Sequence, residues 1–326
     1  MEGPSSKLSV ISVLILLAII SSDINSGSAA AANQLSTEFI RNSCQSTTYP
    51  RLCFSSLSIH ANLIQNSTQL LASTALNVSL SSTRSTSTMM VRLSKSQGMS
   101  PQVIAAMKDC VEELSDSVEE LRKSIGEMRK FKGSNFQLMI NDIQTWVSAA
   151  LTDETTCTDG FHGNAMNGNV KTIVRGRVVN VAQLTSNALA LINRYASHQA
   201  LNVSLSSAKL TSNMMVKISK KRHGMSPPVV AATKDCLEVL SDSVDELRDS
   251  IGEMRKLNSS NFQLIIGDIQ TWVSAALTDE TTCTDGLEGY SLEGKLKTIV
   301  RGRIVRVAKL TSNALALINR YASLHG

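Results

Sequence analysis

Aromatic, proline and glycine residues are scarce in this sequence, and each shortage excludes a class of protein. Of 326 residues, 4% are aromatic, five are proline and seventeen are glycine. Few aromatic side chains argue against a β-sandwich or β-barrel core, and few prolines and glycines exclude collagen-like or proline-rich disordered chains. The net charge is +5 without dense runs of lysine or arginine, which argues against a nucleic-acid-binding protein. Leu, Ala, Ser, Val and Met are plentiful instead, so the composition predicts an all-α fold.

The sequence also lacks a hydrophobic run long enough to span a membrane. The longest run, at 8–20, is well short of the roughly 20 residues that a spanning helix needs. It follows Lys7 and precedes the alanines at 29–32, a pattern typical of a secretory signal peptide. We therefore predict that residues 1–32 are removed and that the mature protein is secreted, soluble and not membrane-bound. Four sequences could then accept N-linked glycans, at Asn66, Asn77, Asn202 and Asn258.

Most of the chain is an internal repeat. Residues 136–160, FQLMINDIQTWVSAALTDETTCTDG, return at 262–286 as FQLIIGDIQTWVSAALTDETTCTDG. A period this long indicates tandem domains rather than a solenoid, whose units have about 20–50 residues. We predict a first domain at 71–197 and a second at 198–326. Only the first domain has a leader, at 33–70.

Each copy contains four segments with helical spacing of hydrophobic residues. The clearest, 101–128, has a hydrophobic residue at every third or fourth position, and Ser100 with Pro101 is typical of a helix start. Four such helices joined by short loops predict an antiparallel four-helix bundle. The segments of the first copy are 71–95, 101–128, 136–151 and 174–195.

No proline or glycine separates the two copies. The junction reads ALALINRYASHQALNVSLSS at 188–207, which contains no helix-breaking residue. We therefore predict that the fourth helix of the first bundle continues, or nearly continues, into the first helix of the second. Such a connection would give a semi-rigid tandem rather than two independent domains.

The six cysteines fall into pairs when the two copies are aligned. Cys110 and Cys157 occupy the same relative positions as Cys236 and Cys283, so each copy carries an equivalent pair. Disulfides form in oxidising compartments, which agrees with the predicted secretion. The remaining pair, Cys44 and Cys53, lies in the leader.

We find no residues arranged for catalysis or metal binding. The sequence has no zinc-protease, phosphate-loop or serine-hydrolase motif, and no histidine has a histidine at its equivalent position in the other copy. We interpret the histidines as surface residues in loops. The carboxylates Asp153, Glu154 and Asp159 recur in the second copy, and we interpret them as a solvated helix end beside a disulfide. The sequence therefore predicts a protein that is not an enzyme, with no cofactor and no metal. The histidines are His60, His162, His198, His223 and His325, and the repeated carboxylates are Asp279, Glu280 and Asp285.

Charge is segregated by helix. The second helix of each copy is acidic and the fourth is basic, which predicts a dipolar surface that could orient a protein partner. A basic secreted protein could also associate weakly with an acidic polysaccharide. The shortage of aromatic residues argues again against nucleic-acid binding.

Three motifs of the first copy occur together in one known family. They are C-x8-C in the leader, KDC at 108–110 and TWVSAALTDETTCTDGF at 145–161. With them the chain resembles the plant invertase/pectin methylesterase inhibitor family, over 40–197 completely and over 200–323 without the leader. The resemblance implies disulfides Cys44–Cys53 and Cys110–Cys157, and the repeat then implies Cys236–Cys283. The predicted fold is all-α, with two tandem antiparallel four-helix bundles, the first preceded by a disulfide-linked helical hairpin.

The resemblance also implies a function, because family members inhibit enzymes by covering the substrate cleft. We expect a secreted inhibitor of pectin methylesterase in the cell wall or apoplast, which would bind through the second and third helices. The alternatives are an inhibitor of cell-wall or vacuolar acid invertase and a non-inhibitory structural protein of the wall. Whether one or both bundles bind stays open. The candidate contact residues are Asp116, Glu120, Lys123, Ser148, Thr152 and Thr155 in the first bundle, and Asp242, Glu246, Ser274, Thr278 and Thr281 in the second.

Overall fold

The protein is described by a computed structural model covering residues 33–96, 100–131, 135–161, 169–220, 226–258, 260–288 and 294–323. Within these ranges the chain is helical with short turns and contains no β-strand. The predicted signal peptide lies outside the described residues, as do His162, His223 and His325.

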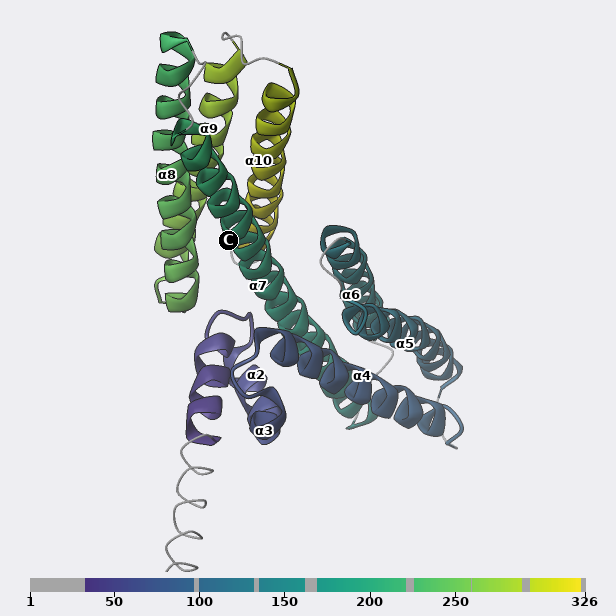
Figure 1. Cartoon of the computed structure of the whole chain (residues 1–326). Coiled ribbons are helices and arrows are strands. Elements are labelled where there is room, and N and C mark those ends of the chain that lie inside the picture. The colour runs from purple at the N-terminus through teal and green to yellow at the C-terminus, as the bar shows by residue number, and fades with distance from the viewer. Residues whose placement is uncertain are drawn as a thin grey trace, which may run out of the picture.

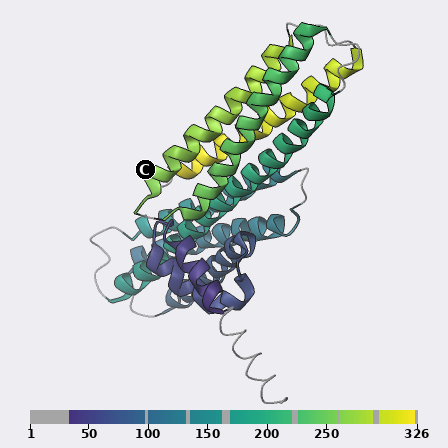
Figure 2. The ribbon, with the colours of Figure 1, turned by 60° about the vertical axis from the view of Figure 1, so that its left-hand side comes forward.

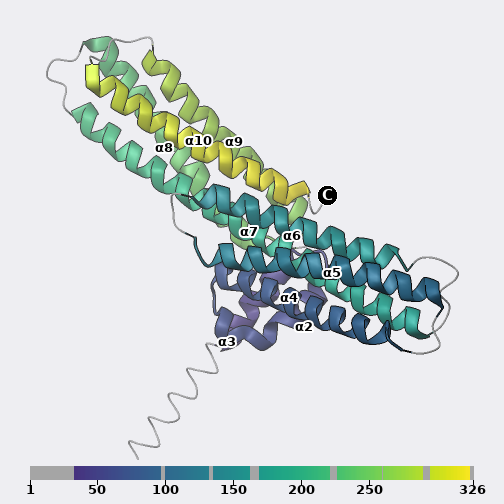
Figure 3. The same ribbon diagram turned by 90° about the vertical axis from the view of Figure 1, so that its right-hand side faces the viewer.

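The described helices form two four-helix bundles that share one long helix (Figure 1). The first bundle consists of α4 (Thr68–Leu93), α5 (Pro101–Met128), α6 (Phe136–Asp159) and the first half of α7 (Asn169–Lys220). The second half of α7 joins α8 (Pro227–Lys256), α9 (Phe262–Glu288) and α10 (Gly294–Ser323). The helices of each bundle run roughly side by side in Figure 3, and Figure 2 shows the same alignment for the second bundle. The predicted all-α tandem is confirmed.

In each bundle, every helix packs mainly on two neighbours, so the four helices lie at the corners of a square in cross-section. In the first, α4 packs mainly on α5 and α7, and α6 packs mainly on the same two helices. The α5–α6 side therefore lies opposite the α4–α7 side. In the second bundle, α8–α9 and α7–α10 are the corresponding opposite sides.

Helix α5 shows how local sequence sets the bundle. Ser100 lies in extended conformation and its Oγ accepts a hydrogen bond from the Val103 N–H at 3.4 Å, while Pro101 occupies the first turn. The predicted hydrophobic stripe faces inward, with Leu114 and Leu121 fully buried. Full burial of a leucine side chain contributes about 2 kcal/mol, so the stripe supplies much of the energy of packing.

Helix α7 runs without interruption through the junction, as the absence of proline and glycine predicted. All residues at 187–197 are buried, because both bundles and the leader pack around this part of the helix. The domain boundary predicted between 197 and 198 therefore lies inside one helix.

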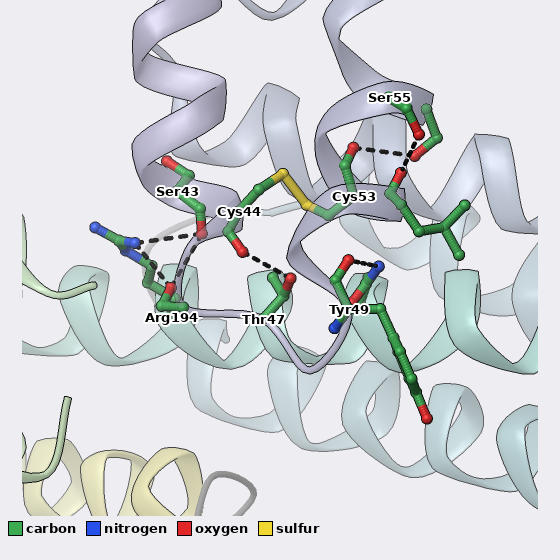
Figure 4. The surroundings of a disulfide bond; sticks show 11 residues. Ser43, Cys44, Thr47, Tyr49, Cys53, Ser55 and Arg194 are labelled. Carbon is green, nitrogen blue, oxygen red and sulfur yellow. Dashed lines mark hydrogen bonds between the residues drawn. A yellow bond between two sulfur atoms is a disulfide. The ribbon is translucent and has the colours of Figure 1, made fainter. Parts of the chain in front are cut away.

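The leader is a hairpin that packs mainly on α4 and α7. Residues 33–44 form a helix, and α2 (Pro50–Leu57), η1 (Ser58–His60) and α3 (Ala61–Ile64) follow the turn. The Cys44–Cys53 disulfide closes the hairpin, and Figure 4 shows its position above α7. At the turn, Asn187 Oδ1 accepts from the Tyr49 N–H at 2.9 Å, and Asn187 Nδ2 donates to the Tyr49 carbonyl at 3.0 Å.

The other two disulfides are those that the repeat and the resemblance implied. Cys110–Cys157 joins α5 to α6, and Cys236–Cys283 joins α8 to α9. Each links the beginning of one helix to the end of the next, which is where antiparallel neighbours meet.

Arg194 ties the leader and both bundles together. This side chain of α7 is only 9% exposed. Its Nη1 donates to Ser46 Oγ at 2.9 Å and to the Ser43 carbonyl at 3.5 Å, while Nη2 donates to the Met254 carbonyl at the end of α8 at 3.3 Å (Figure 4 draws the two leader contacts). Arg320, the equivalent residue of the second copy, is exposed and donates to Gln144 of α6 at 3.0 Å.

The two arginines are a matched pair for a stability test. We expect Arg194→Met to lower the free energy of unfolding by about 3 kcal/mol, because buried hydrogen bonds to a charged group are lost and their acceptors stay desolvated. Arg320→Met should cost about half as much, since that side chain is exposed and makes one such bond, although its acceptor Gln144 is buried. Chemical denaturation at one pH measures both values. Equal losses in the two variants would contradict the assigned role of Arg194.

Candidate functional site

The predicted contact residues of the first bundle lie along the outer side of α5 and α6. Asp116, Lys123, Thr152 and Thr155 are exposed, and Glu120 is half-buried. Glu120 of α5 and Asp153 of α6 lie close enough for each carboxyl group to shift the pKa of the other, so the acidic part of α5 lies beside the helix that carries Thr152 and Thr155. We call the surface of α5 and α6 that carries these residues the α5–α6 face.

Ser148 belongs to the same helix but lies closer to the second bundle. Its Oγ donates to the Gln144 carbonyl at 2.6 Å, and Gln144 is the residue that Arg320 contacts. Ser148 is half-buried, whereas the equivalent Ser274 is exposed. We therefore place Ser148 at the edge of the face rather than within it.

The hydroxyl groups of α6 are prepared to accept hydrogen bonds. Thr152 Oγ1 donates to the Ser148 carbonyl at 3.0 Å, and Thr155 Oγ1 donates to the Leu151 carbonyl at 2.7 Å. Since the hydroxyl protons are used within the helix, the oxygen lone pairs face solvent. A row of short side chains with free acceptors allows the backbone of a partner to approach closely.

Glu120 and Asp153 both have a raised pKa, which the sequence analysis did not predict. Burial, followed by the charge of Asp153, raises the pKa of Glu120 from 4.5 to about 7. Burial also raises the pKa of Asp153, and the charge of Asp116 adds to the effect. The surface therefore becomes more negative as the pH rises toward 7.

The second bundle repeats this face on α8 and α9. Asp242, Ser274, Thr278 and Thr281 are exposed, and burial raises the pKa of the half-buried Glu246 to about 7, with Asp279 as the next cause. One difference is that Asp249 replaces Lys123, so the second face is more acidic. We call it the α8–α9 face.

The sequence analysis interpreted Glu154 as part of a solvated helix end, and for this residue the interpretation was wrong. The side chain is fully buried in the first bundle. Its Oε1 accepts from Ser117 Oγ of α5 at 2.7 Å, from Thr185 Oγ1 of α7 at 3.0 Å and from Thr83 Oγ1 of α4 at 3.3 Å. One carboxyl group on α6 thus joins the other three helices. Asp159, by contrast, is exposed.

Glu280 occupies the same place in the second bundle and is equally buried. Its Oε1 accepts from Ser243 Oγ at 2.8 Å and from Thr311 Oγ1 at 2.9 Å. Burial raises the pKa of Glu154 and of Glu280 from 4.5 to about 7. The sequence contained the signal, because Glu154 continues the inward spacing of Val147, Ala150 and Cys157.

The interpretation of the histidines as loop residues was wrong for His198, which lies half-buried within α7. Burial lowers its pKa, with smaller contributions from Arg255 and Arg194. His60 lies at the end of η1. Within the described ranges, no group of His, Cys, Asp and Glu side chains could hold a metal ion.

The four glycosylation sequences differ in their accessibility. Asn66 is exposed in the turn before α4, and Asn258 lies between α8 and α9. Asn77 and Asn202 lie inside helices, and the serines that complete their sequences, Ser79 and Ser204, are fully buried. Glycosylation at all four remains a prediction.

The fold defines a disulfide-linked protein of two helical bundles. The model of the family described as plant invertase/pectin methylesterase inhibitor matches residues 38–191 and 194–317. The chain belongs to this family and carries its domain twice.

Three curated relatives match about half of this chain over most of their own length. The chain is 48% identical to the 21 kDa protein of Daucus carota over 52% of this chain and 88% of that protein. It is 43% identical to pectinesterase inhibitor 11 of Arabidopsis thaliana over 56% of this chain and 93% of that protein. It is 42% identical to pectinesterase inhibitor 9 of the same plant over 58% of this chain and 95% of that protein. A crystal structure of a mutant form of a pectin methylesterase inhibitor from Arabidopsis covers 46% of this chain and 92% of its own, with a TM-score of 0.39 and 21% identity.

Proposed function

We propose that this protein is a proteinaceous inhibitor of pectin methylesterase and not an enzyme itself. The observation that carries the proposal is its similarity to two pectinesterase inhibitors over more than nine-tenths of their length. The α5–α6 and α8–α9 faces would cover the substrate cleft of the esterase, in a complex burying roughly 1,600 Å² per enzyme. The open acidic and hydroxyl-rich surfaces support this mode of action.

We further propose that the protein is secreted to the cell wall and associates there with acidic polysaccharide. The N-terminal sequence pattern supports secretion. No helix of the described ranges combines the length and hydrophobicity that crossing a membrane requires.

A titration tests the proposed inhibition. Purified full-length protein added to pectin methylesterase should abolish release of methanol from pectin once the inhibitor reaches stoichiometric amounts. Acid invertase serves as the parallel target, and we expect its activity to be unchanged. Full esterase activity at excess inhibitor would contradict the proposal, and inhibition of invertase alone would assign the other target of the family.

Substitutions on the two faces test where the enzyme binds. We expect Thr152→Arg/Thr278→Arg to weaken inhibition at least about tenfold, because a long charged side chain would separate the two surfaces. The matched control is Ser115→Arg/Ser241→Arg, which adds the same charges at exposed positions roughly 140° around the helix from Glu120 and Glu246. Inhibition constants from the same assay compare them. Equal effects of the two variants would exclude the proposed faces.

A further inference from the structure

The side of the first bundle opposite the α5–α6 face contains a groove. It runs along α4, is lined on one side by α2, η1 and α3 of the leader and is closed by Arg177 of α7, and it has a volume of about 540 Å³. A second hollow of about 410 Å³ adjoins it, sharing Ser85, Thr86 and Arg177 with the first. We call the two together the α4–α7 groove.

The groove is positively charged and no carboxylate balances it locally. Arg177 lines both hollows, and Arg84 and Arg92 line the second. All three side chains are exposed, and within the described chain none of them forms an ion pair. Neither α4 nor α7 contains an aspartate or glutamate. Arg84 and Arg92 are eight residues apart, or about 12 Å along α4, so the cations are spread along the groove rather than gathered at a point.

The remaining lining matches the chemistry of a sugar. Hydroxyl and amide groups of Asn77, Ser81, Ser82 and Ser85 can hydrogen-bond to sugar hydroxyl groups. Ile59 and Leu63 of the leader, 80% and 60% exposed, offer apolar surface at the rim. The two hollows are lined by no Phe, Tyr or Trp, and His60 supplies the one aromatic ring in their lining.

The second bundle repeats the groove between α7 and α10. A hollow of about 460 Å³ there is lined by Asn202, Val203 and Arg303, the equivalents of Asn77, Val78 and Arg177, and Arg306 adds a further cation. Where the copies differ, the charge is kept, since Lys209 and Lys217 replace Arg84 and Arg92. The second copy of the repeat has no leader, so no counterparts of η1 and α3 line this groove.

We propose that the α4–α7 groove, and more weakly the α7–α10 groove, binds an oligosaccharide of uronic acids. The arginines would pair with the carboxylates of successive sugar units, and the serine and asparagine side chains would bind the hydroxyl groups. Because the groove lies opposite the α5–α6 face, one bundle could hold an enzyme and a polysaccharide chain at the same time. The sugar-binding proposal goes beyond the inhibitory function and is tested without the enzyme.

The probe is a purified oligogalacturonate of defined length, titrated into the full-length protein at low salt by calorimetry. We expect saturable binding that weakens as salt is added, because dissolved ions screen the attraction between the basic side chains and the sugar carboxylates. The variant Arg84→Gln/Arg177→Gln/Lys209→Gln/Arg303→Gln should raise the dissociation constant at least about tenfold. The control Lys108→Gln/Arg122→Gln/Lys234→Gln/Arg248→Gln removes four exposed cations from α5 and α8 and should change it less than about twofold.

Three outcomes would overturn the proposal. The first is equal weakening by both variants, which would show a dependence on net charge alone. The second is equal binding of the fully methyl-esterified oligomer, which would show that carboxylates are not recognised. The third is equally tight binding of single-stranded DNA that is lost in the same variant, which would assign the groove to polyanions in general. All four groove substitutions are at exposed positions, and gel filtration with the esterase separately reports whether the enzyme complex still forms.

Discussion

Between pH 4.5 and 7 the free energy of unfolding is expected to fall by up to about 6 kcal/mol, through the titration of two buried glutamates. Burial raises the pKa of Glu154 and of Glu280 from 4.5 to about 7. Below pH 4.5 both carboxyl groups are protonated in the folded and the unfolded chain. As the pH rises to 7, the unfolded chain releases these protons while the folded chain keeps them, so folding loses about 1.4 kcal/mol per pH unit at each site. Above pH 7 the loss is complete.

The variant Glu154→Gln/Glu280→Gln isolates this effect. A neutral amide can accept the same hydroxyl hydrogen bonds, so its stability near pH 4.5 should be close to that of the wild type, and it should be more stable at pH 8 by up to about 3 kcal/mol per site. Urea denaturation across the pH range measures the difference. A flat wild-type profile would refute the prediction, as would an unchanged slope in the variant.

The surface pairs supply the control for this experiment. Glu120 and Glu246 also have a pKa raised to about 7, but they are only half-buried, so solvent weakens their contribution. The variant Glu120→Gln/Glu246→Gln should therefore remove a smaller part of the slope. If it removed the larger part, the buried glutamates would not be the main titrating groups.

Loss of the Cys110–Cys157 disulfide is expected to lower the free energy of unfolding by about 4 kcal/mol. The bond closes a loop of 47 residues, and the chain-entropy model gives this value for the constraint that it places on the unfolded chain. The double variant Cys110→Ala/Cys157→Ala avoids a free thiol, and guanidinium denaturation under non-reducing conditions measures its stability.

The other disulfides show whether loop length accounts for the effect. Cys236–Cys283 closes an equally long loop in the second bundle and should contribute the same amount. Cys44–Cys53 spans nine residues and should contribute about 2.5 kcal/mol. A larger loss for the leader pair than for the bundle pairs would contradict the entropic explanation. Because α7 belongs to both bundles, two optical probes are needed to test whether the bundles unfold together.

The helices and disulfides were predictable because their causes are local or repeated. Hydrophobic spacing placed α5, the lack of proline and glycine through 188–207 predicted the continuity of α7, and the duplication grouped the cysteines. Helix periodicity depends on neighbouring residues in the sequence, so one chain is enough to reveal it.

The sequence did not reveal the role of groups whose partners come from distant helices. The spacing of Glu154 indicated that it faces inward, but only the structure shows that Ser117, Thr185 and Thr83 meet around its carboxyl group. The same holds for Asp153, which becomes part of the candidate face through its contact with Glu120. Asp116, Thr152 and Thr155 were assigned to that face by resemblance, and the structure leaves all three exposed.

Because both bundles share helix α7, the number of residues between them fixes the rotation of one bundle relative to the other. An α-helix turns about 100° and advances about 1.5 Å with each residue. A single residue inserted within 187–197 would swing the distal half of the molecule by more than a quarter turn about the proximal half, and Arg320 would leave Gln144. The angle between the α5–α6 face and the α8–α9 face about the axis of α7 is therefore set by the number of residues in that helix.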